Sequence, residues 1–369
     1  MIFQEGGSGL SSLQLRNHSP LGAPARREPA DGTESGMRVS LGFEPAWFHR
    51  RCGVDFSEPW HRDPLFRYQS LVKMQAEVCR AFPEVSDWKA GNLRDLATVS
   101  GCYGACLIPR VFGLPLRYAG DRWPELEPGQ KLSLAEVERL DVDRLLAGPS
   151  AEELFTQMDA IHARWGRIHG YLNWQGVLNN AFHLRGQQVF LDLHDRPQLA
   201  DHLFWIIRET MTRLARLVQE RQRKSGFHVD HLCVSNCTMN LVSPKLYRRF
   251  IFLHDQRIAE SFERFGVHTC NWNATPYLEV LQQLPKVGYL DMGMASDLPK
   301  ARAMFPQARR AVLYSPGKLR EATLEEIAAD LAMVRRDLSP CDLVLADIPA
   351  GTPDTRVKDL LRICAELEA

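Results

Sequence analysis

The sequence predicts an α/β fold: a single (β/α)8 barrel of the TIM type with an irregular N-terminal extension. Three observations favour it. After about residue 150, short apolar segments alternate with long amphipathic helices, a pattern typical of parallel strands joined by right-handed crossovers. Nearly every one of these segments ends in polar residues or glycine, which is what a barrel needs to build one site at its C-terminal face. No glycine-rich nucleotide-binding motif follows a strand, which disfavours an open doubly wound sheet.

The composition excludes several classes of protein. The chain has 369 residues, of which 45% are hydrophobic and 24% charged, so a globular fold is expected. Its 45 basic and 45 acidic residues cancel, which argues against a nucleic-acid-binding surface. No apolar run approaches the roughly 18 residues of a membrane helix, and the N-terminus lacks the order of a signal peptide. Nine scattered cysteines favour a reducing compartment, so we expect a cytoplasmic protein that binds no membrane. Its oligomeric state is not indicated.

The N-terminal part divides into two regions. Residues 1–37 are predicted to be disordered, because they are rich in Gly, Ser, Pro and charges and have no helical or strand period. Met37 opens a more structured segment, so translation is expected to begin there and the first 36 residues to carry no function. Residues 38–150 form an irregular part of the barrel domain, with its first two strands and one helix, Asp63–Phe82, that has Pro64 in its first turn.

Residues 151–369 are predicted to form the regular part of the barrel. The strands are short and apolar on both faces, as expected for strands covered by helices. The predicted strands are Gly166–Tyr171, Val229–Ser235, Val267–Asn271, Gly288–Met292, Arg310–Tyr314 and Asp342–Ile348. The predicted helices are Gly186–Arg223, Pro244–Phe265, Thr275–Leu284, Asp297–Phe305, Thr323–Leu338 and Asp354–Leu367.

The segment His268-Thr269-Cys270 is the strongest candidate for chemistry. Residues two apart in a strand point to the same face, so the imidazole and the thiol are expected to lie together at the open end of the barrel. They would make half of a tetrahedral zinc site. A further ligand must come from a neighbouring strand, and both Cys237 and Asp291 are candidates.

Other cysteines are less suitable as ligands. Cys341 opens its strand and is therefore expected far from the top face. Five other cysteines are expected to have only a structural role: Cys52, Cys79, Cys102, Cys106 and Cys364.

Four polar residues outside this segment are further candidates. His169 at a strand end would act as an acid or base, or bind substrate. Asn173 and Asn236 are suited to orienting a carbonyl or hydroxyl group. Arg62 would bind a carboxylate from an entry loop.

Several short motifs occur in a characteristic order, and together they carry a family resemblance. They are Gly176-Val177-Leu178, Leu184-Arg185-Gly186, Leu191-Asp192-Leu193-His194-Asp195-Arg196-Pro197, Ser243-Pro244-Lys245-Leu246-Tyr247, His268-Thr269-Cys270 and Asp347-Ile348-Pro349-Ala350-Gly351. From about Leu126 onward, the chain resembles the uroporphyrinogen decarboxylase superfamily of single (β/α)8 barrels. It is most similar to the corrinoid and coenzyme M methyltransferase branch.

The resemblance implies methyl transfer between a corrinoid protein and a thiol at a zinc ion. The family's His-x-Cys pair corresponds to His268 and Cys270, and its third ligand is a cysteine directly before Asp-Ile-Pro. That position is Ala346 here, so either Cys237 or a carboxylate replaces the sulfur, or the zinc function is lost. The Arg-Gln-Ala-Gly-Arg segment with which the decarboxylases hold their substrate is not found in this sequence.

Three functions follow from this sequence. The leading hypothesis is a methyltransferase-like enzyme with zinc, a small-molecule substrate and a corrinoid protein partner. The second is a carboxy-lyase of porphyrin metabolism or one acting on a smaller acid, in which His169, Asp291 or Asp347 handles protons. The third is a binding protein that keeps the barrel without turnover.

Overall fold

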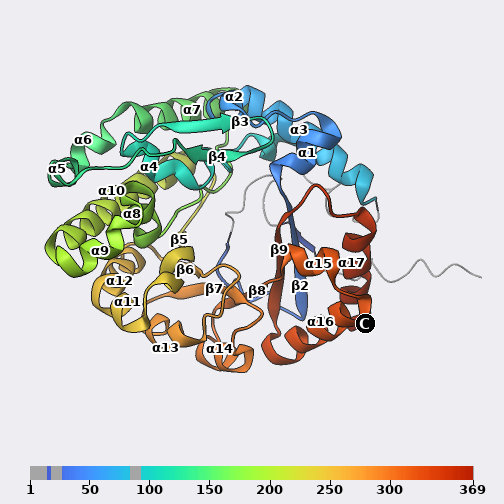
Figure 1. Ribbon diagram of the computed structural model, residues 1–369. Helices are drawn as coiled ribbons and strands as arrows, with labels where there is room; N and C mark the ends of the chain where they lie inside the picture. The colour runs from blue at the N-terminus through green and yellow to red at the C-terminus, as the bar shows by residue number, and fades with distance from the viewer. Residues whose placement is uncertain (1–14, 18–26, 84–92, 369) are drawn as a thin grey trace, which may run out of the picture.

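The computed structural model describes residues 15–17, 27–83 and 93–368. Its centre is a parallel sheet of seven strands in the order β1-β2-β9-β8-β7-β6-β5, with helices around it (Figure 1). The strands are β1 (Leu15–Asn17), β2 (Met37–Phe43), β5 (His231–Ser235), β6 (Arg264–His268), β7 (Val287–Gly293), β8 (Arg309–Leu313) and β9 (Cys341–Ile348). β2 pairs with β9, so segments from the two ends of the sequence lie side by side.

Two isolated parallel bridges continue the sheet beyond β5. Gln175 pairs with Ser235 at the end of β5, and Thr98 pairs with His169. The extended segment that contains His169 and Gln175 therefore lies beside β5, and the segment around Thr98 lies beside that one. This parallel α/β arrangement is consistent with a TIM-type barrel.

The helices form an outer layer around the strands (Figure 1). The α-helices are α1 (Pro45–Cys52), α2 (Glu58–Arg62), α3 (Pro64–Ala81), α4 (Leu107–Val111), α5 (Leu134–Glu138), α6 (Val142–Leu146), α7 (Pro149–Trp165), α8 (Val177–Arg185), α9 (Gln188–Asp195), α10 (Pro197–Lys224), α11 (Pro244–Phe250), α12 (Phe252–Glu260), α13 (Leu278–Leu281), α14 (Leu298–Met304), α15 (Pro316–Glu321), α16 (Leu324–Leu338) and α17 (Asp354–Glu368). The 3-10 helices are η3 (Leu93–Leu96), η4 (Gly104–Cys106), η5 (Cys237–Leu241) and η6 (Thr275–Tyr277), and β3 (Leu116–Ala119) with β4 (Arg122–Leu126) forms a separate antiparallel pair.

Several predicted elements are confirmed. The predicted helix after Asp63 is α3, and the Asp63 side chain accepts hydrogen bonds from the backbone N–H groups of Leu65 and Phe66, as an N-cap does. β5, β7, β8, β9, α14, α16 and α17 lie close to their predicted ranges. These elements have strong local patterns and clear capping or turn residues at their ends.

Two predicted helices differ from the structure. The helix expected over Gly186–Arg223 is divided into α9 and α10 at Arg196, because Pro197 cannot donate a backbone hydrogen bond inside a helix. The helix expected over Pro244–Phe265 ends at Glu260, and the next strand already begins at Arg264. β6 therefore ends at His268, earlier than predicted.

The strand expected over Gly166–Tyr171 also begins later. Gly166 ends α7 in the left-handed region, with φ 83°, a conformation that glycine adopts without strain. The extended segment then continues to the bridge at Gln175. His169 consequently lies near the start of this segment, whereas the sequence placed it at the end.

Part of the N-terminal extension, residues 15–17 and 27–36, is among the residues that the structure describes. Leu15–Asn17 pair with β2, and residues 27–36 contact the beginnings of β6, β7 and β8. The backbone N–H of Ala30 donates to Gly288 at 2.8 Å, and the fully buried Arg309 pairs with Glu34 at 2.7 Å. Charged residues that suggested disorder are held here by opposite charges. Residues 1–14 and 18–26 lie outside the described residues.

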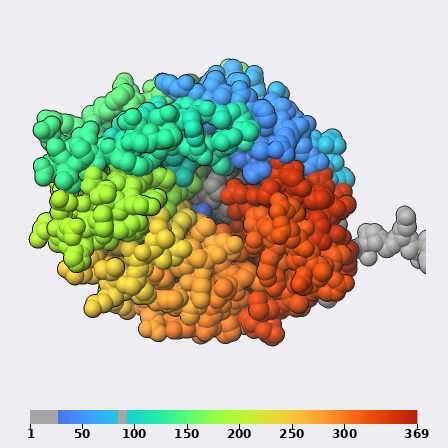
Figure 2. Space-filling model, in the orientation of Figure 1, coloured from blue at the N-terminus to red at the C-terminus, as the bar shows by residue number. Residues whose placement is uncertain are grey.

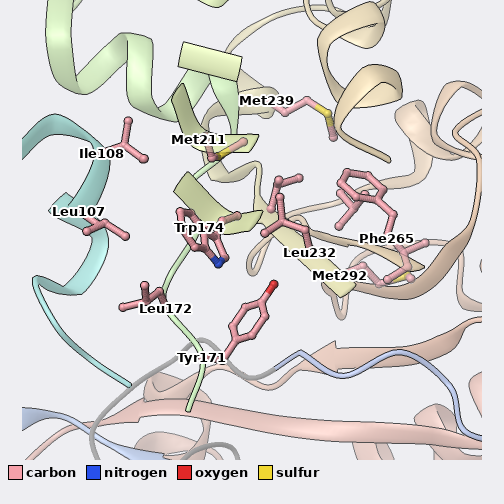
Figure 3. Close-up of a cluster of buried hydrophobic side chains, with 14 of the residues drawn as sticks. Leu107, Ile108, Tyr171, Leu172, Trp174, Met211, Leu232, Met239, Phe265 and Met292 are labelled. Atoms are coloured by element: carbon pink, nitrogen blue, oxygen red, sulfur yellow. The ribbon is translucent and has the colours of Figure 1, made fainter. Parts of the chain in front are cut away.

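The core has an inner and an outer layer. Inside the sheet, Cys233, Tyr289, Ala311, Leu313 and Val344 form one buried cluster. The larger cluster lies between strands and helices, where Figure 3 shows side chains from several elements packed together. Figure 2 shows a hollow at the centre of one face, between residues from the middle and the C-terminal part of the chain. Among the described residues, no helix is both long enough and apolar enough to span a membrane.

Candidate metal centre

Three potential metal ligands come together after two neighbouring strands. Cys237 follows β5 as the first residue of η5, His268 is the last residue of β6, and Cys270 lies two residues further on. One ligand atom of each lies within 4.8 Å of the other two, and within the described part of the chain no other group of three such residues is as close. The structure therefore brings together the predicted pair and the first of its two predicted partners.

Cys270 reaches this position by a different route from the one predicted. It does not belong to β6, and its backbone is left-handed, with φ 68°. A non-glycine residue in this region is strained. The two side chains therefore meet because the chain turns at Cys270, rather than because they share the face of one strand.

Asp291 in β7 orients His268. The Nδ1–H group of His268 donates to Asp291 Oδ2 at 2.7 Å, and the backbone N–H of Thr269 donates to Asp291 Oδ1 at 2.8 Å. The hydroxyl of Tyr289 donates to Oδ2 at 3.0 Å. With Nδ1 engaged in this way, Nε2 is the nitrogen that remains to bind a metal, and a carboxylate on the far ring nitrogen is typical of metal-binding histidines. The prediction of Asp291 as a ligand is therefore not supported by this geometry.

The electrostatics of the site favour a thiolate at Cys270. A hydrogen bond from Cys237 lowers the pKa of the Cys270 thiol, and this outweighs burial. His268 contributes in the same direction. The pKa of Cys237 is raised by the same hydrogen bond and by burial. Burial and Arg27 lower the pKa of His268, but Asp291 and Cys270 outweigh them and leave it raised.

The donor set fits zinc. Two sulfur atoms and one imidazole nitrogen are ligands that zinc prefers, and three protein ligands with an open fourth position are typical of catalytic sites. With zinc–ligand bonds of about 2.0–2.3 Å, the donor atoms of a tetrahedral site lie roughly 3.5–3.8 Å apart, within the observed limit of 4.8 Å. Cys237 and Cys270 are only half-buried, so a further ligand can approach.

A polar network continues from the site toward the N-terminal segment. Arg27 donates from a terminal guanidinium nitrogen to Ser235 Oγ at 2.6 Å, and its Nε lies 3.7 Å from Asp291 Oδ2. The hydroxyl of Ser235 donates to Asn173 Oδ1 at 3.3 Å. Asn173 therefore lies in the same network as Asp291, and it is buried.

Asp347 and Ala346 lie at an irregular point of β9. The register between β2 and β9 shifts here, and Asp347 has φ 54°. The Asp347 side chain reaches solvent, yet desolvation by the surrounding protein, together with Glu44 and Cys270, raises its pKa. Ala346 packs against the inner cluster and offers no ligand atom.

Three candidate residues have other partners. His169 Nε2 lies 3.3 Å from Asp95, near the start of its extended segment. Asn236 donates to the buried Asp255 of α12 at 2.8 Å, so its side chain turns outward beneath the helices. Arg62 pairs with Glu58 and Glu153. The side chains of these three residues therefore have partners outside the Cys237–His268–Cys270 group, although the backbone N–H of Asn236 donates to the His268 carbonyl at 2.8 Å. Their roles in binding or catalysis stay predictions.

Sequence reasoning missed three residues of the network: Arg27, Ser235 and Tyr289. Tyr289 could have been found, because it lies two residues from Asp291 in β7 and so shares its face. Ser235 is the last residue of β5, and its face relative to Cys237 does not follow from strand alternation. Arg27 had no such signal. It lies in a segment rich in glycine, proline and charges, which composition alone assigns to disorder.

Comparison with known proteins finds a similar fold. The structure resembles that of a methyltransferase from Methanosarcina mazei, with a TM-score of 0.64 and 17% sequence identity, over 93% of this chain and 96% of that chain. No protein-family model matches the sequence, and no curated protein matches it. At this identity the likeness shows the fold alone.

Proposed function

We propose that this protein is a zinc-dependent methyltransferase of the uroporphyrinogen decarboxylase superfamily. Cys237, His268 and Cys270 would hold the metal, with Cys237 in place of the sulfur that Ala346 cannot supply. The observation that carries this proposal is the convergence of the three donor atoms within 4.8 Å. The fold shared with a methyltransferase supports it.

The finer architecture is part of the same proposal. We infer an eight-membered barrel made of β2, the segment around Thr98, the segment from His169 to Gln175, and β5 to β9. The pairing of β2 with β9 and the two parallel bridges support this order. In such a barrel, the residues that follow β5 and β6 lie at the C-terminal face, where barrel enzymes have their active sites.

The protein's own residues prepare the site for a thiol substrate. Zinc, when bound, acts as a Lewis acid that keeps a thiol deprotonated at neutral pH. Asp291 accepts from Nδ1 of His268 and so keeps Nε2 available. Thr269 links the end of β6 to Asp291 through its backbone N–H and through its hydroxyl, which donates to the Asp291 carbonyl at 2.7 Å. The position of His268 is therefore fixed before a ligand arrives.

Asp347 is proposed to accept the proton of the incoming thiol. Its side chain is exposed. Desolvation by the surrounding protein, then Glu44 and Cys270, raise its pKa and make it a better base than an ordinary aspartate. The methyl group would leave a corrinoid protein and form a carbon–sulfur bond with the thiolate. The corrinoid protein is thus the proposed partner.

The carboxy-lyase alternative receives less support. It requires arginines from the N-terminal region to hold substrate carboxylates. Arg62 already pairs with two glutamates, and Arg27 lies beside Asp291. Neither guanidinium is free of a carboxylate.

Metal analysis tests the proposal. We expect the purified wild-type protein to bind about one zinc per chain, because its donor set is that of a catalytic site. Cys270→Ser and Cys237→Ser should each weaken zinc binding by about 100-fold or more, measured by titration against a competing chelator. Cys52→Ser is the matched control. The Cys52 thiol donates to the Phe48 carbonyl within α1, far in the sequence from the three proposed ligands.

The same proteins can be assayed for methyl transfer from methylcobalamin to small thiols, with mass spectrometry of the thioether product. Activity that is lost when zinc is removed, and that is also lost in Cys270→Ser, supports the proposal. A wild-type protein that neither contains nor binds zinc would refute it. Decarboxylation that survives chelation would favour the carboxy-lyase instead.

A further inference from the structure

Arg27 is a buried cation that comes from outside the regular βα units. It is only 5% exposed, and it lies among inner-face residues of β5 and β7. It donates to Ser235 Oγ at 2.6 Å and lies 3.7 Å from Asp291 Oδ2. Its Nε has no hydrogen-bond partner within the described residues. A buried charge of this kind is costly unless an opposite charge is near, so its place beside Asp291 calls for an explanation.

The segment that carries Arg27 is firmly attached at the N-terminal ends of the strands. The backbone of Ala30 pairs with Gly288 at the start of β7, and Arg264 at the start of β6 donates to the Ala30 carbonyl at 3.2 Å. Arg309 at the start of β8 pairs with Asp31 and Glu34. The segment that carries Arg27 is thus attached at the N-terminal ends of the strands. The three proposed ligands lie at the C-terminal ends of β5 and β6.

Arg27, Asp291 and His268 form a row of neighbouring side chains in which positive and negative groups alternate. Arg27 lies beside Asp291, Asp291 accepts from His268 Nδ1, and the free side of His268 faces the two sulfur atoms. Asp291 is 1% exposed, so within the described residues its negative charge is balanced chiefly by Arg27 and by the His268 N–H group. A buried carboxylate with one of its two positive neighbours removed is poorly stabilised.

We propose that Arg27 is a positioning residue of the metal centre, which holds the Asp291 carboxylate in the orientation that fixes the His268 ring. The residues from Arg27 to Gly36 would therefore belong to the functional protein and act as the support of the site. This inference rests on the proposed function only in treating His268 as a metal ligand, because the Arg27–Asp291–His268 line is independent of the reaction.

The test uses the full-length protein with ¹⁵N-labelled histidine and without metal. The ring signals of His268 are identified by their loss in His268→Gln. Arg27→Ala should shift or broaden these signals, because the Nδ1–H group loses a fixed acceptor. Arg27→Lys keeps the charge and should give a smaller shift. Arg27→Gln removes the charge but keeps a polar side chain with N–H donors, although a shorter one, and it serves where Arg27→Ala fails to fold.

Glu34→Gln is the matched control. It weakens the attachment of the same segment through Arg309 but leaves Arg27 unchanged, so it should leave the His268 signals in place. In a zinc titration, Arg27→Ala should bind zinc roughly 10- to 100-fold more weakly, as is usual for loss of an outer-shell partner. Unchanged His268 signals in folded Arg27→Ala or Arg27→Gln would overturn the proposal, and so would an equal shift in Glu34→Gln. If the wild type binds no zinc, the proposed function fails, but the ring signals still decide the role of Arg27.

Discussion

Two buried histidines, His61 and His268, show how differently the same side chain is used in two regions. In the N-terminal region, His61 Nε2 donates to the Phe56 carbonyl at 3.1 Å, and Nδ1 accepts from the Tyr103 N–H at 3.1 Å. Both ring nitrogens are thus used by the backbone. In the regular region, His268 uses only Nδ1 for Asp291 and directs its other side to two cysteines.

The surroundings of the two histidines differ in the same way. Near His61, Arg67 bonds to the Thr98 and Trp60 carbonyls and to Gln157. The hydrogen bonds of this cluster join Arg67 and His61 to backbone carbonyls, a backbone N–H group and a glutamine, and they stabilise the fold. The cluster around His268 has a strained Cys270 and half-buried thiols. The comparison teaches that remaining ligand capacity, more than burial, separates a binding histidine from a structural one.

The largest expected effect is on stability and belongs to the His61 region. Arg67→Ala should lower the free energy of unfolding by about 3 kcal/mol or more, because it leaves three buried acceptors without a donor and opens a cavity. Urea unfolding measures the loss. Arg80→Ala removes the exposed partner of Glu77, which keeps its ion pair with Arg51, and should change stability by less than about 0.5 kcal/mol. Zinc binding by folded Arg67→Ala should be unchanged; a loss of affinity would join the two regions that we treat as separate.

The next effect belongs to the His268 region. Asp291→Asn keeps the size of the side chain but removes its charge, so zinc affinity should fall roughly 10- to 100-fold, about 1.4–2.8 kcal/mol. Asp255→Asn is the matched control, because Asp255 is equally buried but bonds to Asn236 and Tyr247 behind β5. Equal losses of affinity in both variants would mean that general packing, rather than the Asp291–His268 contact, controls the metal.

The dependence of stability on pH tests the structural role of His61. Burial and then Arg67 lower the pKa of His61 to about 3, so the unfolded chain takes up this proton first as the pH falls. The contribution of neutral His61 to the free energy of unfolding is complete above pH 6.5 and is lost progressively toward pH 3. Between pH 6.5 and pH 5 the free energy of unfolding should fall by roughly 2 kcal/mol from this group. His61→Gln should be less stable at pH 7.5 but lose less on acidification. Parallel stability curves for the two proteins would contradict this role.

The smallest expected effect is a gain. Ala346 packs against the inner cluster of the sheet, at the position that the sequence resemblance assigns to a third metal-binding cysteine. Ala346→Cys should therefore tighten zinc binding by about tenfold, through a further sulfur near the site. Competition with a chelator measures the change, and Ala346→Ser serves as a control for size and polarity. An unchanged affinity would indicate that a sulfur at position 346 does not reach the metal that Cys237, His268 and Cys270 are proposed to hold.

The parts of the molecule that the sequence predicted are those set by local pattern. β5, β7, β8 and β9 follow from apolar segments of the right length, and α3 from its cap at Asp63. His268 and Cys270 were found because they are close in sequence. The geometry that brings them together was not predicted, because a pattern of alternating side chains does not reveal that Cys270 has a left-handed backbone.

The errors have a common physical origin in strand ends and long-range contacts. A shift of one residue at the end of a strand reverses the face of a side chain, so Asn236 turned out to bond beneath the helices. His169 was misplaced because its extended segment begins later than expected. Arg27 contacts residues more than two hundred positions away, and no local pattern records such a contact.

The pairing of β2 with β9 has a consequence for how the protein is made. Met37 is hydrogen-bonded to Glu368 in α17 at 3.1 Å. β2 has β1 on one side, but it meets its other neighbour, β9, only when β9 has been synthesised. During translation, the apolar strand β2 therefore waits with an open edge until almost the whole chain has left the ribosome. Such non-local contacts slow folding and expose strands to aggregation, so we expect chaperones to raise the yield of this protein more than that of one whose neighbouring strands are consecutive.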